Sequence, residues 1–122
     1  MKEVKKKWGK EVWLVNEPEY CGKLLYIDKG ASSSIHYHPK KKETFYCGAG
    51  AVLITSGDEG SIYYPDSEPV TIPPMRKHLF YGLLERNILI EISTHHEDDD
   101  VVRLTKSRGP SGKRIYSRRD RD

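Results

Sequence analysis

The sequence predicts an all-β fold, a sandwich or barrel of short strands in a single domain. The chain has 122 residues, which is the length of one domain. Short runs rich in β-branched and aromatic residues recur about every ten residues and alternate with the residue types that form turns. No stretch has apolar side chains at the helical spacing i, i+3, i+4 and i+7 for long before a Pro or Gly interrupts it.

Each predicted strand is followed by a turn former or a change to polar sequence. The strands are expected, in chain order, at residues 11–15, 23–27, 34–38, 44–47, 51–55, 61–64, 70–72, 78–83 and 87–93. Val, Leu and Ile dominate the first two and the last of these runs, and Tyr, Phe and Thr add strand propensity to the others. The turns between them lie at residues 16–18, 29–30, 48–50, 56–60, 65–66 and 73–74. Residues 95–100 are polar and mostly acidic, and residues 101–104 are a brief apolar segment.

Basic residues are concentrated at the C-terminus. The chain has 21 Lys and Arg against 18 Asp and Glu, a net charge of +3. Residues 105–122 contain seven of the basic and two of the acidic residues, which leaves 14 basic and 16 acidic residues in 1–104. We therefore predict a β domain at 1–104, a basic and flexible tail at 105–122, and no specific nucleic-acid partner.

Membrane insertion and disulfide bonding are not expected. No segment approaches the roughly 18–20 apolar residues that cross a bilayer, and the charged N-terminus lacks the apolar region of a secretory signal. We predict a cytoplasmic protein without membrane contact. The two cysteines, Cys21 and Cys47, are too few for a disulfide scaffold and are expected to be small buried hydrophobic residues.

Three histidines and one glutamate have the pattern of a metal site. His36 and His38 are two residues apart on a predicted strand, so both side chains point to the same face. Glu43 begins the next strand, and His78 begins a later one after a rigid proline corner. Three imidazoles and a carboxylate suit one divalent transition metal ion (Zn, Mn, Fe, Ni or Co) and leave positions open for water or substrate.

The spacing of these residues resembles the first motif of the cupins. That motif is Gly, five residues, His-x-His, three or four residues, Glu, six residues, Gly. The matching positions here are Gly30, His36, His38, Glu43 and Gly50. The resemblance implies a small antiparallel β-barrel of the jelly-roll type with one metal ion on the histidines and the glutamate.

The second cupin motif is only half kept. Pro73 and His78 match it, whereas Met75 stands at the motif's Gly position and Gly82 at its Asn position. The departure concerns the entrance to the strand and not the metal ligand. In a wider comparison, residues 8–104 resemble the cupin half of type II mannose-6-phosphate isomerases and related sugar-isomerase cupins. This resemblance implies a metal-dependent aldose–ketose isomerase acting on a small sugar, in particular a sugar phosphate.

The resemblance also implies catalytic residues, which we assign as Glu91 and Glu43. In sugar-isomerase cupins an acidic residue on a late strand lies near the metal, and Glu91 is the leading candidate for the proton-transferring group. An alternative stays open, because Ile88, Ile90 and Ile92 alternate with Glu91. If the isoleucines face the core, Glu91 points to solvent.

Basic residues bracket the predicted ligands and suggest a small anionic sugar as substrate. The candidates for substrate binding are Lys40, Lys41, Lys42, Arg76, Lys77 and Arg103. The lysine run is equally consistent with a solvated loop. Arg103 is either a phosphate ligand or a partner of the acidic residues 97–100.

Two other functions remain open at this point. A cupin dioxygenase using Fe(II) would also suit three His and one Glu, and Tyr46-Cys47 is similar to the residue types that form the thioether of some thiol dioxygenases. A non-catalytic cupin module that binds metal or sugar is the other alternative. We further expect a homodimer, since Trp8 and Trp13 flank an early strand that either packs on a partner or seals the barrel.

Overall fold

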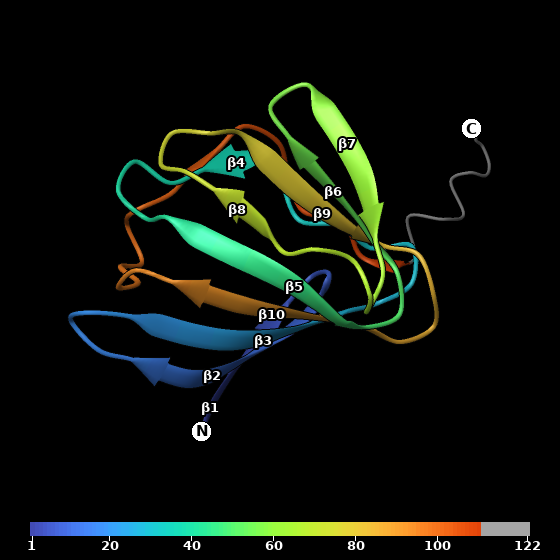
Figure 1. Cartoon of the computed structure of the whole chain (residues 1–122), viewed down its shortest axis with the longest axis horizontal. Coiled ribbons are helices and arrows are strands. Elements are labelled where there is room, and N and C mark those ends of the chain that lie inside the picture. Colours follow the sequence, from blue (N-terminus) through green and yellow to red (C-terminus); the bar gives the residue numbers. More distant parts are fainter. Residues whose placement is uncertain (111–122) are drawn as a thin grey trace.

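The chain folds into two antiparallel β-sheets that face each other (Figure 1). The structure is a computed structural model and describes residues 1–110. The six-stranded sheet has the order β1-β2-β3-β10-β5-β8, and the five-stranded sheet has the order β11-β4-β9-β6-β7. No α-helix occurs in this described part of the chain, which confirms the all-β prediction.

The strands are short, as the sequence indicated. Those of the larger sheet are β1 Lys2–Lys6, β2 Gly9–Asn16, β3 Cys21–Ile27, β10 Asn87–Ser93, β5 Glu43–Ala49 and β8 Val70–Ile72. Those of the smaller sheet are β11 Val102–Arg103, β4 His36–Tyr37, β9 His78–Gly82, β6 Val52–Ser56 and β7 Glu59–Tyr63.

Side chains that alternate along the strands fill the space between the sheets. The buried core consists of Trp8, Leu25, Ile27, Ala31, Phe45, Cys47, Val52, Ile54, Ile72, Phe80 and Leu89. Trp8 packs edge-on against Phe80 with ring centroids 4.9 Å apart, so this tryptophan seals the barrel from within. Cys21 and Cys47 are buried and free, as predicted.

Strand β1 is absent from the sequence prediction, because its lysines hide the alternation. It pairs with β2 in a register that places Lys2 opposite Trp13 and Lys6 opposite Gly9. The ammonium of Lys2 lies 4.3 Å from the centre of the Trp13 ring. Lysines are common on edge strands, where they discourage pairing with another chain.

The isoleucines of β10 point away from the core. Leu89 and Glu91 are buried, whereas Ile92 is 60% exposed. The expectation that Glu91 points to solvent is therefore wrong. Hydrophobic patterning takes the most apolar face of a strand as its inner face. In β10 the apolar face is the outer one, where Ile90 pairs with Leu24 on β3 and Tyr46 on β5.

The segment after β10 returns across the smaller sheet. Backbone and side-chain hydrogen bonds join Ser32 to Arg108, Ile35 to Thr105 and Ser34 to Ser107. Residues 105–110, which the sequence assigned to the tail, thus pack on the barrel. The rest of the predicted tail, residues 111–122, lies outside the described residues.

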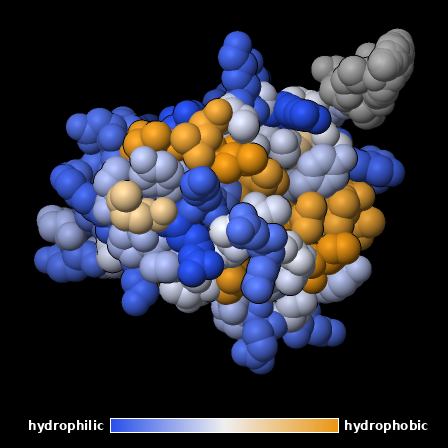
Figure 2. All heavy atoms as spheres, turned by 90° about the horizontal axis from the view of Figure 1, so that it is seen from above, coloured by the Kyte–Doolittle hydropathy of each residue, from blue (hydrophilic) through white to orange (hydrophobic). Residues whose placement is uncertain are grey.

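The outer surface is hydrophilic with scattered apolar areas. Figure 2 looks from above in the orientation of Figure 1, onto the side of the five-stranded sheet, and shows these areas among hydrophilic ones. Exposed apolar side chains of this sheet include Ile62 and Val102. Residues 1–110 form no helix with the length and apolarity needed to cross a membrane.

Candidate metal centre

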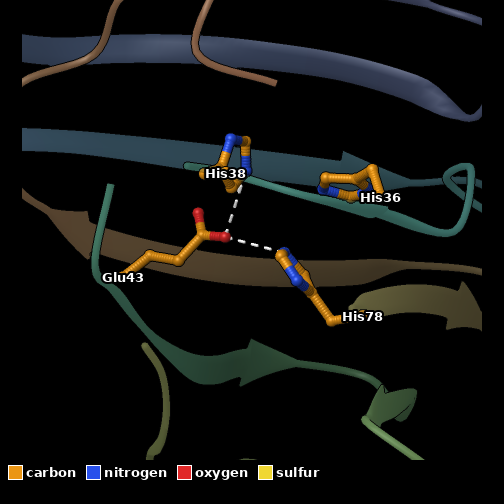
Figure 3. A group of neighbouring side chains, drawn as sticks. All are labelled: His36, His38, Glu43 and His78. Atoms are coloured by element: carbon orange, nitrogen blue, oxygen red, sulfur yellow. Dashed lines mark ion pairs between the residues drawn. The ribbon is translucent and has the colours of Figure 1, made fainter. Parts of the chain in front are cut away.

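The predicted ligands meet between the two sheets (Figure 3). His36 lies on β4 and pairs directly with His78, the first residue of β9, while Glu43 begins β5 in the facing sheet. Each of His36, His38, Glu43 and His78 offers one ligand atom, and these atoms all lie within 4.8 Å of one another. The structure therefore brings His78 together with the two imidazoles and the carboxylate of residues 36–43.

Backbone carbonyls fix the tautomer of all three histidines. Nδ1 of His36 donates to the carbonyl of Ser34 at 2.8 Å, and Nδ1 of His78 donates to that of Arg76 at 2.8 Å. Nδ1 of His38 donates to the carbonyl of Asp100 at 2.7 Å. A carbonyl only accepts, so in each neutral imidazole the proton is on Nδ1 and the lone pair is on Nε2. This is the arrangement that metal-binding histidines use.

Two buried atoms at the centre lack a hydrogen bond. They are Oε2 of Glu43 and Nε2 of His78, which lie 2.7 Å apart. Nε2 of His38 is 3.3 Å from the same carboxylate oxygen. Lone pairs that face each other at these distances in a buried site need a proton or a metal ion between them. The donor set therefore fits a divalent transition metal ion, although its identity does not follow from the ligands.

The electrostatics of the ligands agree with metal binding. Burial, followed by the proximity of His78, lowers the pKa of His36 to about 3, so this imidazole is neutral and able to coordinate. Burial alone would raise the pKa of Glu43. The imidazoles of His38 and His78 and the ammonium of Lys41 outweigh that effect, and the pKa is lowered well below its usual value.

The corner before His78 has a left-handed residue where the second cupin motif has Gly. Met75, at the motif's Gly position, has a φ of 71°. Left-handed backbone of this kind favours glycine. Its amide donates to the carbonyl of His38 at 2.8 Å, which links the corner to the metal centre.

Gly82, at the motif's Asn position, has no room for a side chain. A Cβ there would lie 2.8 Å from Nδ2 of Asn87 and 2.5 Å from the carbonyl of Asp28. Asn87 is buried and bonds to the backbone of Ile27, Ala51 and Leu84. An asparagine from β10, the next strand along the chain, thus fills the space beside Gly82.

Asp100 is a site residue that sequence reasoning did not find. Besides accepting from His38, it is buried, and its two carboxylate oxygens accept the amides of Lys40 at 2.8 Å and Lys41 at 3.0 Å. Asp100 therefore orients one metal ligand and the loop that follows it. The acidic run at 97–100 was the only signal, and nothing local distinguishes its last residue from the others.

Glu91 and Lys41 lie beside the metal centre in the interior. The Lys41 ammonium is 3.2 Å from Oε2 of Glu91 and 3.6 Å from Oε1 of Glu43. Burial, and next the charge of Glu43, raise the pKa of Glu91. Burial alone would lower the pKa of Lys41, but the carboxylates of Glu91 and Glu43 outweigh burial and raise it. A buried carboxyl with a raised pKa takes up a proton more readily than an exposed carboxyl does.

The other predicted cations lie farther from the ligands. Lys40, Lys42, Arg76 and Lys77 are exposed, and none of them lines the cavity within the described residues. Lys40 pairs with Glu97 at 3.1 Å. Arg103 is exposed at the cavity rim and forms no ion pair within residues 1–110.

The metal centre opens into a cavity of about 980 Å³ between the larger sheet and the segment after β10. The ligands His36, His38 and Glu43 line it together with Lys41 and Glu91. Two features that the sequence did not indicate, the lysines of β1 and the buried Lys23, also border it. The cavity is large enough for a small sugar.

Tyr46 and Cys47 do not form a joint site. They are neighbours on β5 and point to opposite faces, since Cys47 is buried in the core and Tyr46 is exposed. The Tyr46 hydroxyl donates to the carbonyl of Pro65. The feature that suggested a thioether-type dioxygenase therefore has no counterpart in the structure.

Comparison with known proteins defines the fold. No family model and no curated protein matches the chain. The structure matches KdgF from Halomonas sp. with a TM-score of 0.69 and 19% identity, over 74% of this chain and 81% of KdgF. It also matches Pac13 from Streptomyces, solved with uridine, with a TM-score of 0.74 and 12% identity, over 91% of this chain and 88% of Pac13. The fold is a cupin-type β-barrel.

A larger protein contains the same cupin barrel. The capsular polysaccharide assembling protein CapF from Staphylococcus aureus matches with a TM-score of 0.74 and 19% identity. The match covers 84% of this chain and 31% of CapF. At these identities the comparisons establish the cupin barrel, while the metal centre rests on the residues described above.

Proposed function

We propose that this chain is a metal-dependent isomerase that transfers a proton between adjacent carbons of a small anionic sugar, as in aldose–ketose isomerisation. One observation carries the proposal. A buried carboxyl with a raised pKa, Glu91, lies in the same cavity as a three-histidine, one-glutamate centre. Such a reaction needs a group that accepts and returns a proton beside a group that stabilises negative charge on oxygen.

The residues divide these tasks between them. His36, His38, Glu43 and His78 would hold a divalent ion, which when bound polarises a carbonyl and stabilises charge that develops on its oxygen. Glu91 would take the proton from one carbon and return it to the next. Lys41, between Glu91 and Glu43, keeps the two carboxylates from repelling each other and adds positive charge to the cavity wall.

The names of proteins with a similar fold support a sugar-like substrate. CapF is a capsular polysaccharide assembling protein, and Pac13 is a nucleoside dehydratase. Both names point to sugar-containing molecules. The narrower proposal, a mannose-6-phosphate isomerase-like activity, rests on the sequence resemblance over residues 8–104.

A coupled assay that interconverts mannose 6-phosphate and fructose 6-phosphate tests the proposal. The metal-free protein is loaded in turn with Mn, Co, Ni, Fe and Zn, and a panel of unphosphorylated aldoses is included. Glu91→Gln is expected to lower kcat by about 100-fold or more while metal content stays unchanged. Glu97→Gln, which alters an exposed acid, is the matched control and should retain activity.

Proton transfer gives a second measurement. In D₂O, the wild-type protein should introduce deuterium at the carbon that exchanges its proton, and Glu91→Gln should not. Absence of both turnover and exchange with every ion would reject the isomerase and leave a non-catalytic metal- or sugar-binding cupin.

A further inference from the structure

Lys23 is a buried cation in the cavity wall with no part in the metal centre. It points inward from β3 and is 1% exposed. In the sheet register it lies between Trp13 on β2 and Glu91 on β10. Its ammonium lies 4.2 Å from the centre of the Trp13 ring and 3.8 Å from Oε1 of Glu11. A lysine buried this deeply needs strong acceptors.

The main acceptor of Lys23 is a neutral nitrogen that it shares with Lys41. Nδ1 of His96 lies 3.0 Å from the Lys23 ammonium and 3.3 Å from the Lys41 ammonium. Nε2 of His96 lies 2.9 Å from Oδ1 of Asp98. Since that carboxylate accepts, the proton is on Nε2 and Nδ1 presents a lone pair. Two buried cations therefore converge on one uncharged acceptor.

The two ammoniums have unused donors. Each lysine has three N–H groups. Lys23 makes one hydrogen bond, to His96, and Lys41 makes two, to His96 and Glu91, within residues 1–110. Half of the donors thus make no hydrogen bond there, and the nearest other acceptors, Glu11 for Lys23 and Glu43 for Lys41, lie 3.8 Å and 3.6 Å away. An anionic oxygen accepts such hydrogen bonds more strongly than an imidazole does.

The backbone of His96 is held in place by hydrogen bonds, whereas its ring can rotate away from the two lysines. The backbone amide of His96 donates to Oδ1 of Asn16 at 2.9 Å, and its carbonyl accepts from Nδ2 of Asn16 at 3.2 Å. The ring, by contrast, touches Trp13 edge-on and reaches outward to the exposed Asp98. Rotation of the ring would free both ammoniums without unfolding the segment.

We propose that Lys23 and Lys41 form the subsite for the anionic group of the substrate, and that a carboxylate or phosphate oxygen takes the place held here by Nδ1 of His96. This inference deepens the proposed function, because Lys41 also lies 3.6 Å from the ligand Glu43 and so joins the subsite to the metal centre. The other cations that the sequence suggested for substrate binding are not part of this subsite.

Trp13 supplies a direct measurement, because it contacts both Lys23 and His96. Metal-free protein is titrated with inorganic phosphate, D-glucuronate or neutral D-glucose at constant ionic strength, and tryptophan fluorescence is recorded. We expect a saturable change with at least one anion and none with glucose. A saturable change with only one of the two anions, phosphate or glucuronate, identifies the anion that the subsite prefers. No saturable change with either anion would overturn the subsite.

Variants test the assignment of each residue. Lys23→Met should weaken anion binding about tenfold or more, whereas Lys29→Met, which alters an exposed lysine outside the cavity, should bind as the wild type does. His96→Ala should bind the anion more tightly, because it removes the competing acceptor. If Lys23→Met does not fold, His96→Ala tests the subsite by itself. Unchanged or weaker anion binding by His96→Ala would contradict the proposal that the anion displaces the His96 ring.

These measurements need neither metal nor turnover. Anion binding that depends on Lys23, in a protein without isomerase activity, would keep the subsite and reject the proposed function. A Lys23→Met protein that keeps both isomerase activity and normal anion binding would support the proposed function and reject the subsite.

Discussion

The backbone carbonyl of Asp100 accepts the Nδ1 proton of His38 at 2.7 Å, although 62 positions separate the two residues. The carboxylate of the same aspartate accepts the amides of Lys40 and Lys41. One residue of the segment after β10 therefore sets the ring orientation of a metal ligand and the start of the loop that presents Lys41. The metal centre and the cavity wall are coupled through this contact.

Asp100→Ala is expected to weaken metal binding by about 10- to 100-fold, which is the usual effect of losing a group that orients a ligand. The carbonyl remains, but without the carboxylate nothing holds it against His38 and the lysine loop. Metal affinity is measured by competition with a chelator. Asp99→Ala, an exposed neighbour, is the control. Equal affinities for the two variants would show that the carboxylate does not position the site.

His36→Ala and His38→Ala are each expected to remove bound metal and to leave the barrel folded. The ligands would surround a bound ion, whereas the apolar core extends beyond them to residues such as Ile27, Val52 and Leu89. Elemental analysis gives the metal content, and circular dichroism with thermal melting reports the fold. Metal content equal to that of the wild type would refute the ligand assignment.

Met75→Gly is expected to raise the free energy of unfolding by up to about 1 kcal/mol. The left-handed backbone costs a methionine about 1–2 kcal/mol, and the greater freedom of glycine in the unfolded chain offsets part of the gain. Met75 is 60% exposed, so little packing is lost. Denaturant unfolding measures the change. A loss of stability would mean that the methionine side chain contributes more than its backbone strain costs.

The sequence predicted the metal ligands because their spacing is local to a few strands. Alternation on one strand placed His36 and His38 on one face, and the motif added Glu43 and His78. Asp100 and His96 escaped prediction because their roles depend on contacts with residues far away in the chain. Glu91 could not be placed by periodicity, since its strand is apolar on the outer face and polar on the inner one. The larger sheet buries charged groups inward to build a cavity, and hydrophobic patterning assumes the opposite.

The outward apolar face of the larger sheet leads us to expect a homodimer. Ile92 is 60% exposed and Tyr46 is 37% exposed, and both lie on this face beside Ile90. Light scattering should give about twice the monomer mass of 14.1 kDa. Ile92→Lys should give the monomer, whereas Ile62→Lys, on the smaller sheet, should stay dimeric. A wild-type protein of monomer mass would contradict this expectation.

His96 should titrate below the ordinary value for a histidine, and Lys23 should be one cause. Burial lowers the pKa of His96, the charge of Lys23 lowers it next, and Lys41 acts in the same direction, while the hydrogen bond to Asp98 partly opposes them. As the pH falls below about 6.5, the unfolded chain binds a proton at this position before the folded chain does. The contribution of His96 to stability is therefore complete above that pH and declines as the pH falls through the lowered pKa.

The ring proton signals in an NMR titration give the pKa of His96 directly. Lys23→Met should raise it toward the ordinary value, because the repelling charge on β3 is gone, and Lys42→Met should leave it unchanged. If the pKa of His96 is the same in Lys23→Met as in the wild type, the 3.0 Å contact between Lys23 and His96 does not form in solution.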